Sequence, residues 1–244
     1  MIEIKLFKDA KLKGYTLLEG FPGAGLVGPM ANSYIIEKLQ MQYIGHIESD
    51  AFPPIAAVHD GMAMFPVRIY KDDKYRLIVI MSEFSIPATM IYELSQELLA
   101  FIRKQGIEKV VSIGGMPTLK PINAAYGIAT TKELNDKIKS AKINMISEGV
   151  VAGVSAILLA NGPEYNIPIV DLLVQVDPTI MDPKYAITAI TNLKKIININ
   201  VSTDELEKEA KVIEAKVRDI MKKARDSHES YKNATEAAGP SMYA

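Results

Sequence analysis

Short apolar runs alternate with amphipathic segments along the first 200 residues of the chain. Apolar runs of this length are typical of buried strands, and they lie at residues 15–18, 44–47, 67–70, 75–81, 110–113, 126–130 and 167–176. Between them, apolar side chains recur at helical spacing, which predicts helices over residues 27–39, 87–105, 132–140, 150–160 and 183–197. The polar stretch 71–74 joins two of the runs and predicts a hairpin.

The strand-like runs are mostly apolar, without strict alternation of apolar and polar residues, and helices lie between them. This pattern favours a mostly parallel sheet that helices cover on both faces, with some antiparallel pairing from the hairpin. Residues 1–201 are therefore expected to form one α/β domain, a three-layer sandwich around a mixed sheet.

The pattern changes after Val201. Ser202 and Glu205 have the spacing of a capping box, in which each side chain satisfies a free backbone N–H of the other. A seam of apolar residues with spacings of four and three follows, at Leu206, Ala210, Ile213, Val217, Ile220 and Ala224. We expect a C-terminal helix over residues 202–225. Its seam either packs on the domain or joins subunits of a homo-oligomer.

The last nineteen residues, 226–244, are mostly polar and small. They offer too little apolar surface to form a core, so we expect a flexible tail. The tail ends in Met242, Tyr243 and Ala244. An aromatic side chain beside a free carboxylate suits a docking peptide, in which the ring fills a pocket and the carboxylate meets a lysine or a backbone nest.

Composition excludes several classes of function. The 28 basic and 29 acidic residues of the 244-residue, 26.8 kDa chain leave a net charge of −1, which removes the electrostatic case for nucleic acid as a partner. The absence of cysteine excludes disulfides, thiolate metal sites and cysteine nucleophiles. No apolar run is long enough to span a membrane, and the N-terminus lacks a signal-peptide core, so a cytoplasmic location is expected.

Residues 20–28, GFPGAGLVG, carry the sharpest local motif. Gly23, Gly25 and Gly28 match the G-x-G-x-x-G pattern that cradles a pyrophosphate between a strand and a helix. In that hypothesis the protein is an NAD(P)-dependent enzyme, and Glu48 or Asp50 near the second strand would bind the ribose. The alternative is a tight turn in which glycine allows close packing, and the lack of a hydride-transfer apparatus favours it.

A hydrolase can also be assembled from the sequence. Ser155 lies in a partial nucleophile-elbow pattern, with Asp171 or Asp177 and then His228 in the order of that fold. The pattern lacks its second glycine, and His228 falls in the expected tail. Metal-ligand spacings are absent as well. We therefore expect no catalytic residues, no metal and no cofactor.

The order of three segments resembles the proteasome assembly chaperone 2 family, in its archaeal branch. These segments are residues 20–28, the stretch Gly114-Gly115-Met116-Pro117-Thr118, and residues 149–162. The resemblance covers about residues 14–225. It implies a nucleoside-phosphorylase-like α/β sandwich without catalytic residues, a homo-oligomer (tetramer or pentamer), and an ATP-independent chaperone that assists assembly of the proteasome core particle.

The resemblance also gives the C-terminal residues a role. Met242-Tyr243-Ala244 is similar to the hydrophobic–tyrosine–X ending with which proteasome regulators enter pockets between α-ring subunits. It implies that Tyr243 is the anchor, that the Ala244 carboxylate pairs with a pocket lysine, and that Met242 packs beside the rim. The expected partners are proteasome α subunits and further copies of this chain.

Overall fold

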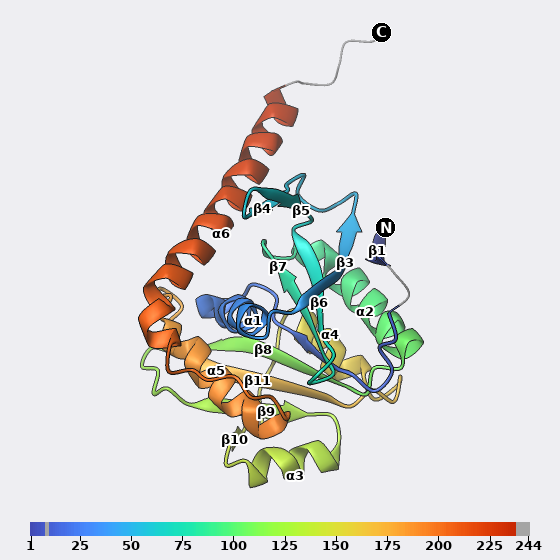
Figure 1. Ribbon diagram of the computed structural model, residues 1–244, viewed down its shortest axis with the longest axis vertical. Coiled ribbons are helices and arrows are strands. Elements are labelled where there is room, and N and C mark those ends of the chain that lie inside the picture. Colours follow the sequence, from blue (N-terminus) through green and yellow to red (C-terminus); the bar gives the residue numbers. More distant parts are fainter. Residues whose placement is uncertain (8–9, 238–244) are drawn as a thin grey trace.

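The computed structural model describes residues 1–7 and 10–237 of the chain. In this part, nine strands form one mixed sheet (Figure 1) in the order β1-β3-β6-β7-β2-β8-β11-β9-β10. Their bounds are β1 Ile2–Leu6, β2 Thr16–Glu19, β3 Gln42–Ser49, β6 Val67–Asp72, β7 Leu77–Ser82, β8 Lys109–Pro117, β9 Ala125–Ala129, β10 Asn144–Met145 and β11 Ile169–Val176. A separate small hairpin joins β4, Ala57–His59, to β5, Met62–Met64.

The four central strands, β7, β2, β8 and β11, run parallel to one another. Antiparallel pairs surround them: β1 with β3, β3 with β6, β6 with β7, and β11 with β9. The hairpin predicted around residues 71–74 is confirmed as the β6–β7 pair, in which Val67 lies opposite Ser82. The sheet is therefore parallel at the centre, where crossover helices connect its strands, and mostly antiparallel outside it, although the short edge strand β10 pairs parallel with β9.

Helices cover both faces of the sheet, which confirms the three-layer sandwich. Helices α1 (Val27–Lys38) and α5 (Pro183–Ile196) pack together on one face, and α2 (Ile91–Gln105) packs with α4 (Val154–Asn161) on the other. The short α3 (Lys132–Ser140) lies beside β9 and β10. Within the described residues, no helix is both long and apolar enough to cross a membrane.

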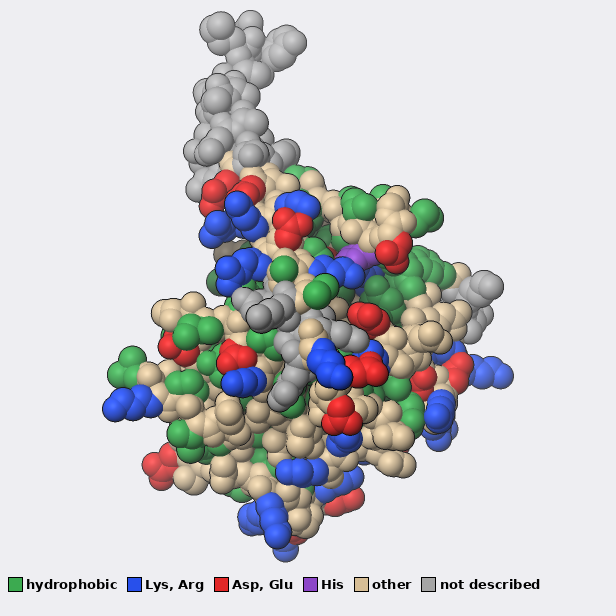
Figure 2. All heavy atoms as spheres, turned by 60° about the vertical axis from the view of Figure 1, so that its left-hand side comes forward, with side chains coloured by type: hydrophobic (Ala, Val, Ile, Leu, Met, Phe, Trp, Pro, Cys, Tyr) green, Lys and Arg blue, Asp and Glu red, His purple; other side chains and the backbone are tan. Residues whose placement is uncertain are grey.

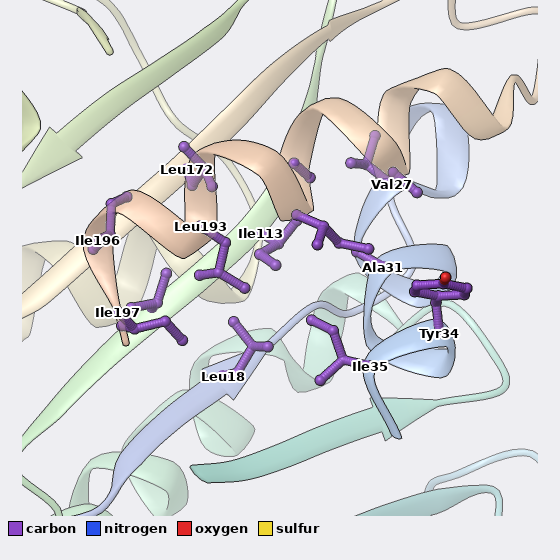
Figure 3. Packing of buried hydrophobic residues seen from close by; sticks show 14 of the residues in the cluster. Leu18, Val27, Ala31, Tyr34, Ile35, Ile113, Leu172, Leu193, Ile196 and Ile197 are labelled. Atoms are coloured by element: carbon purple, nitrogen blue, oxygen red, sulfur yellow. The ribbon is translucent and has the colours of Figure 1, made fainter. Parts of the chain in front are cut away.

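Alternating residues of the central strands build a separate core on each face. Leu18, Ile113 and Leu172 face α1 and α5, where they belong to the same cluster as Ile35 and Leu193 (Figure 3). All five side chains are buried. Residues one position away in the strands, such as Leu17, Val110 and Ile169, belong to the second core beneath α2 and α4. Burial on both faces explains why these strands read as continuous apolar runs.

Several elements differ from the sequence predictions. Helix α4 begins at Val154 rather than at residue 150, and α2 begins at Ile91 after one turn of 3-10 helix, Ala88–Met90. Strands β1, β4, β5 and β10 were not predicted. In β1 the charged Glu3 and Lys5 alternate with apolar residues, because only one face of this edge strand is covered.

Helix α6 is longer than predicted and runs from Leu206 to Ala237. Residues 226–237, assigned above to a flexible tail, continue this helix. They contain neither glycine nor proline, so nothing in them interrupts a helix that has already been nucleated upstream. At 1.5 Å per residue the helix is about 48 Å long, and Figure 1 shows its C-terminal half projecting beyond the domain.

The predicted capping box at the start of α6 does not form as expected. The Ser202 hydroxyl accepts a hydrogen bond from the Asp204 N–H at 3.2 Å and donates one to the Asp204 carboxylate at 3.0 Å. The Glu205 carboxylate instead forms an ion pair with Lys38 of α1, at 2.7 Å. Glu205 thus tethers the start of α6 to the domain.

Candidate functional site

The glycine-rich segment turns the chain from β2 into α1 through one turn of 3-10 helix, Ala24–Leu26. Gly25 has a φ of +65°, and a Cβ at this position would lie 2.9 Å from the Val176 Cγ1 atom. A Cβ on Gly28 would lie 2.7 Å from the Ile113 carbonyl oxygen. The space beside these two glycines is therefore occupied by the chain's own β8 and β11, which supports the packing interpretation. Gly23 differs, because its nearest such neighbour is 4.0 Å away.

The acids proposed to bind a ribose lie elsewhere. Glu48 and Asp50 are at the end of β3, and strands β6 and β7 separate β3 from β2. The Glu48 carboxylate pairs with Lys5, and the Asp50 carboxylate binds the N-terminal ammonium group at 2.8 Å. This part of the dinucleotide hypothesis is wrong, because the second strand of a Rossmann unit lies beside the first.

A pocket of about 930 Å³ opens at the carboxyl edge of β2, β8 and β11. Gly23 and Gly115 lie at its edge, Leu173 and Gln175 of β11 line its wall, and residues 145–153 cover it. The charged residues of its lining are Glu19 and Glu148, and the described part of the chain contributes no Lys, Arg or His to it. A phosphate would meet two carboxylates here and no cation, so the pocket is unsuited to a pyrophosphate.

Three polar residues lie side by side on the central strands beneath this pocket. Ser112 of β8 is opposite Glu19 of β2 on one side and opposite Asp171 of β11 on the other. Their exposed fractions are 1%, 3% and 0%. Burial raises the pKa of Glu19 to about 7. Burial, together with repulsion from Glu19, raises the pKa of Asp171 to about 7.

Hydrogen bonds satisfy this cluster only in part. The Glu19 Oε2 atom accepts the Phe21 N–H at 3.3 Å. Within the described residues, no hydrogen bond of good geometry reaches either carboxylate oxygen of Asp171 or the Ser112 hydroxyl. Ser112 and Ser155 nevertheless lie close enough to Glu19 and Asp171, respectively, to offset part of the rise in the pKa of each acid. Buried polar atoms without partners are uncommon in folded proteins, and each typically costs about 1–3 kcal/mol.

In the sequence, Asp171 is a candidate only as part of a hydrolase triad, and the structure does not assemble that triad. Ser155 lies in the first turn of α4 and lines the pocket near Asp171. Asp177 accepts a hydrogen bond from the Thr179 hydroxyl at 2.6 Å, beyond the end of β11. His228 belongs to α6, which packs on α1 and α5 across the sheet from α4. Among the described residues, no group of three or more His, Cys, Asp or Glu could hold a metal ion.

The apolar seam of α6 packs on the chain's own domain at three of its six positions. Leu206 and Val217 are buried in the core beneath α1 and α5, and Ala224 is buried in the other core. Ile220 is half-buried. The side chains of Ala210 and Ile213 lie outside the described residues. Subunit association through the seam remains a prediction, and the three buried positions favour the intramolecular alternative.

Beside the middle of α6 lies a second groove, of about 710 Å³. Apolar side chains, including Leu26, Phe84 and Met221, line it together with Arg218, Lys222 and Arg225 of α6. Figure 2 shows basic and acidic side chains along this part of the helix. The sequence pattern alone does not reveal the groove, although basic residues at positions 218, 222 and 225 share one helical face.

The predicted docking residues Met242, Tyr243 and Ala244 lie outside the described residues. What the structure does describe is the helix that precedes them. Ala224 is the last residue of the seam buried against the domain. The thirteen residues from 225 to 237 add about 20 Å of helix beyond it, and this stretch projects away from the domain (Figure 1).

Comparisons with known proteins place the chain among archaeal relatives. An uncharacterized protein of Methanocaldococcus jannaschii is 29% identical over 219 residues, which is 89% of this chain and 90% of that protein. The structure of PbaA from Pyrococcus furiosus, described as an archaeal homolog of proteasome-assembly chaperone, matches with a TM-score of 0.82. It is 28% identical, and the match covers 91% of this chain and 100% of that one.

A protein of unknown function from Thermoplasma acidophilum matches with a TM-score of 0.80 and 28% identity, over 93% of this chain and 91% of that one. The model of the PAC2 family matches residues 17–221, which include the glycine-rich turn, the acidic pocket and most of the α6 seam. The match covers well over half of the chain. The protein therefore belongs to the PAC2 family.

Proposed function

We propose that this protein is an ATP-independent chaperone that binds α subunits of the proteasome core particle and assists their assembly. Family membership and the match to PbaA, a homolog of proteasome-assembly chaperone, support the class of function. The acidic lining of the pocket beside the glycine-rich turn supports the absence of a nucleotide-driven step, because it repels phosphate groups.

The observation that carries the proposal is the projection of α6 from the domain (Figure 1). After Ala224 the helix leaves the domain, so its described end at Ala237 lies away from the domain surface. The seven residues after Ala237 could span at most about 25 Å when fully extended. Together with the projecting helix, they give the C-terminal end a reach of about 45 Å beyond Ala224.

At that end, we propose that Met242-Tyr243-Ala244 binds a pocket between neighbouring α subunits. Tyr243 would insert its ring, the Ala244 carboxylate would pair with a pocket lysine, and Met242 would pack at the rim. Such a contact needs few residues, because an aromatic anchor and one charge-assisted hydrogen bond concentrate the binding energy. The domain itself stays free to contact the outer surface of the α subunits.

The experiment is assembly of purified proteasome α subunits with and without the full-length protein, in the absence of ATP. We expect the two proteins to co-elute in size-exclusion chromatography, and α rings to form faster when the chaperone is present. The matched control is an equal concentration of an unrelated 27 kDa protein, which corrects for crowding. Failure to co-elute, together with unchanged assembly kinetics, would contradict the proposal.

A further inference from the structure

The groove beside the middle of α6 is not used by the proposed chaperone function. Its volume of about 710 Å³ is within the range of ligand-binding clefts. Two surfaces of different origin form it: residues of α6 between Arg218 and Arg225 on one side, and residues of the domain, among them Pro53, Phe84 and Met181, on the other. The chemistry of these two sides determines what the groove can bind.

The α6 side of the groove carries a basic rim, formed by Arg218, Lys222 and Arg225. All three residues are exposed and line the groove. They follow one another at spacings of four and three, so they lie on one face of the helix. At 1.5 Å per residue they span about 10 Å along the helix axis. Lys222 makes no ion pair within the described residues, so its charge is available to a ligand.

The domain side of the groove is apolar and is held in place by the chain around it. The Ser82 hydroxyl donates a hydrogen bond to the Phe84 carbonyl oxygen at 2.7 Å and accepts one from the Phe84 N–H at 3.3 Å. The Phe84 ring packs edge-on against Phe52, with the ring centroids 5.1 Å apart. The adjacent Glu83 is buried, and its carboxylate pairs with Arg68. The described domain residues that line the groove are therefore uncharged.

Acidic side chains do not offset the basic rim inside the groove, because no Asp or Glu of the described chain lines it. Of the nearby acids of α6, Asp219 pairs with Lys223 at 2.5 Å, and Asp226 lies 3.9 Å from the Arg225 Nε atom. An inorganic anion would use only the basic rim, and an uncharged apolar molecule would use only the domain side. A ligand that uses both sides needs negative charge along one edge and apolar surface along the other.

An extended peptide has these two edges when acidic and apolar residues alternate along it. Side chains two apart in an extended chain point to the same side and are about 6.6 Å apart. This spacing is close to the rise of about 6 Å along the helix axis between Arg218 and Lys222. Carboxylates form strong, directional hydrogen bonds with arginine and lysine. We propose that the groove binds an extended segment of a partner protein in which Asp or Glu alternates with large apolar residues.

Binding of such a segment should depend on salt. The chain as a whole has a net charge of −1, so the attraction for an acidic segment comes from the basic rim and not from the overall charge. Since the rim is exposed, its ion pairs are screened as the Debye length falls from about 30 Å at 0.01 M salt to about 8 Å at 0.15 M. The proposal concerns the groove alone and does not depend on the chaperone function or on the C-terminal residues.

The test uses the full-length protein and fluorescein-labelled hexapeptides, blocked at both ends, in fluorescence anisotropy titrations. The reference peptide alternates glutamate with leucine. Glutamine replaces glutamate in a second peptide, and serine replaces leucine in a third. We expect both to bind the wild-type protein at least tenfold more weakly than the reference peptide, whose own affinity should fall as salt is added. No binding of the reference peptide, or equal binding of either comparison peptide, would overturn the proposal, and this result does not depend on any variant folding.

Variants then locate the site. Lys222→Glu and Arg225→Glu each reverse one charge of the basic rim and should weaken binding of the reference peptide at least tenfold. Lys216→Glu makes the same kind of change at an exposed position of α6 outside the groove and should bind like the wild type. A peptide that alternates lysine with leucine should bind Lys222→Glu more tightly than it binds the wild type, a gain that misfolding cannot produce. Wild-type binding of the reference peptide by both rim variants, or an equal loss in Lys216→Glu, would overturn the assignment to this groove.

Discussion

Gly20 and Gly28 lie so close together that a Cβ built on Gly20 would be 2.7 Å from the Gly28 Cα atom. Gly20 follows the end of β2, and Gly28 is in the first turn of α1. The strand and the helix therefore touch through their backbones at this point. At Gly28, a motif with the spacing of a pyrophosphate loop packs a helix on a sheet, and protein atoms occupy the space that a side chain would need.

The first prediction follows from this contact. Replacing Gly28 with alanine forces a Cβ within 2.7 Å of both the Gly20 backbone and the Ile113 carbonyl oxygen. Neither neighbour is a flexible side chain, so the helix must shift. We expect Gly28→Ala to lower the free energy of unfolding by about 2–3 kcal/mol, as measured by urea denaturation.

The matched control for this prediction is Gly23→Ala in the same segment. Its Cβ would have no neighbour closer than 4.0 Å, and its φ of −148° is accessible to alanine. We expect a change within about 0.5 kcal/mol. Equal effects of the two substitutions would mean that the segment responds to any change of residue and that the close approach is not what matters.

The second prediction concerns the pH dependence of stability. In the folded protein the carboxyl pKa values of Glu19 and Asp171 are raised to about 7, whereas in an unfolded chain they are about 4. Between these values the folded state binds more protons than the unfolded state, so raising the pH lowers the free energy of unfolding. One such group lowers the free energy of unfolding by about 3–4 kcal/mol between about pH 4 and pH 8. Urea denaturation at several pH values in this range measures the decrease.

A single substitution separates this effect from other titrations. Asp171→Asn cannot ionise, so its stability should fall less steeply than that of the wild type between about pH 5 and pH 8. Asp136→Asn, on the exposed face of α3, should reproduce the wild-type slope. The acids whose pKa values are lowered, such as Glu83, titrate below this window and do not disturb it. A wild-type slope in Asp171→Asn would contradict the assignment.

The third prediction compares two valines of α6. Val217 is buried against the domain, whereas Val212 is 69% exposed. Introducing a carboxylate at Val217 places a charge in the core, and we expect Val217→Asp to lower the free energy of unfolding by about 2–4 kcal/mol. Val212→Asp makes the same chemical change at the surface and should be within about 0.5 kcal/mol of the wild type.

The same two variants test whether the seam also joins subunits. Sedimentation velocity gives the mass of each variant beside that of the wild type. If the seam only packs on its own domain, Val217→Asp will change stability and leave the mass of the folded protein unchanged. A smaller mass for Val217→Asp at temperatures where it remains folded would instead support the seam as a subunit contact.

Most of the fold could be predicted from the sequence because its central strands are buried on both faces. Residues 110–113 and 167–176 are mostly apolar and do not alternate with polar residues, and such runs indicate covered, parallel strands. Edge strands such as β1 and the two-residue β10 produce no clear apolar run in the sequence, because they are short or covered on one face only. The length of α6 was underestimated because polar composition was interpreted as disorder, although helix propensity permits a long polar helix.

The polar cluster of Glu19, Ser112 and Asp171 beneath the pocket was harder to predict. A signal existed, since Asp171 interrupts the apolar run IVDLLV and Ser112 interrupts VVSIGG. A polar residue within a buried strand implies a partner or a ligand. What the sequence does not provide is the strand order, which places β8 between β2 and β11 and so brings Glu19 and Asp171 to the two sides of Ser112. The same strand order overturned the role proposed for Glu48 and Asp50.

The final prediction concerns the C-terminal residues, where binding and folding should be separable. Replacing Tyr243 with alanine removes the proposed anchor, and adding one residue after Ala244 displaces the carboxylate by about 3.5 Å. In the proposed function both changes should weaken binding to proteasome α rings at least tenfold, as measured by surface plasmon resonance. The matched control is Tyr92→Ala, which removes a 62% exposed tyrosine from α2. It should bind like the wild type. All three variants should keep the wild-type melting temperature, because none alters the buried core. Wild-type binding by both C-terminal variants would show that the domain surface, and not the C-terminal residues, contacts the α ring.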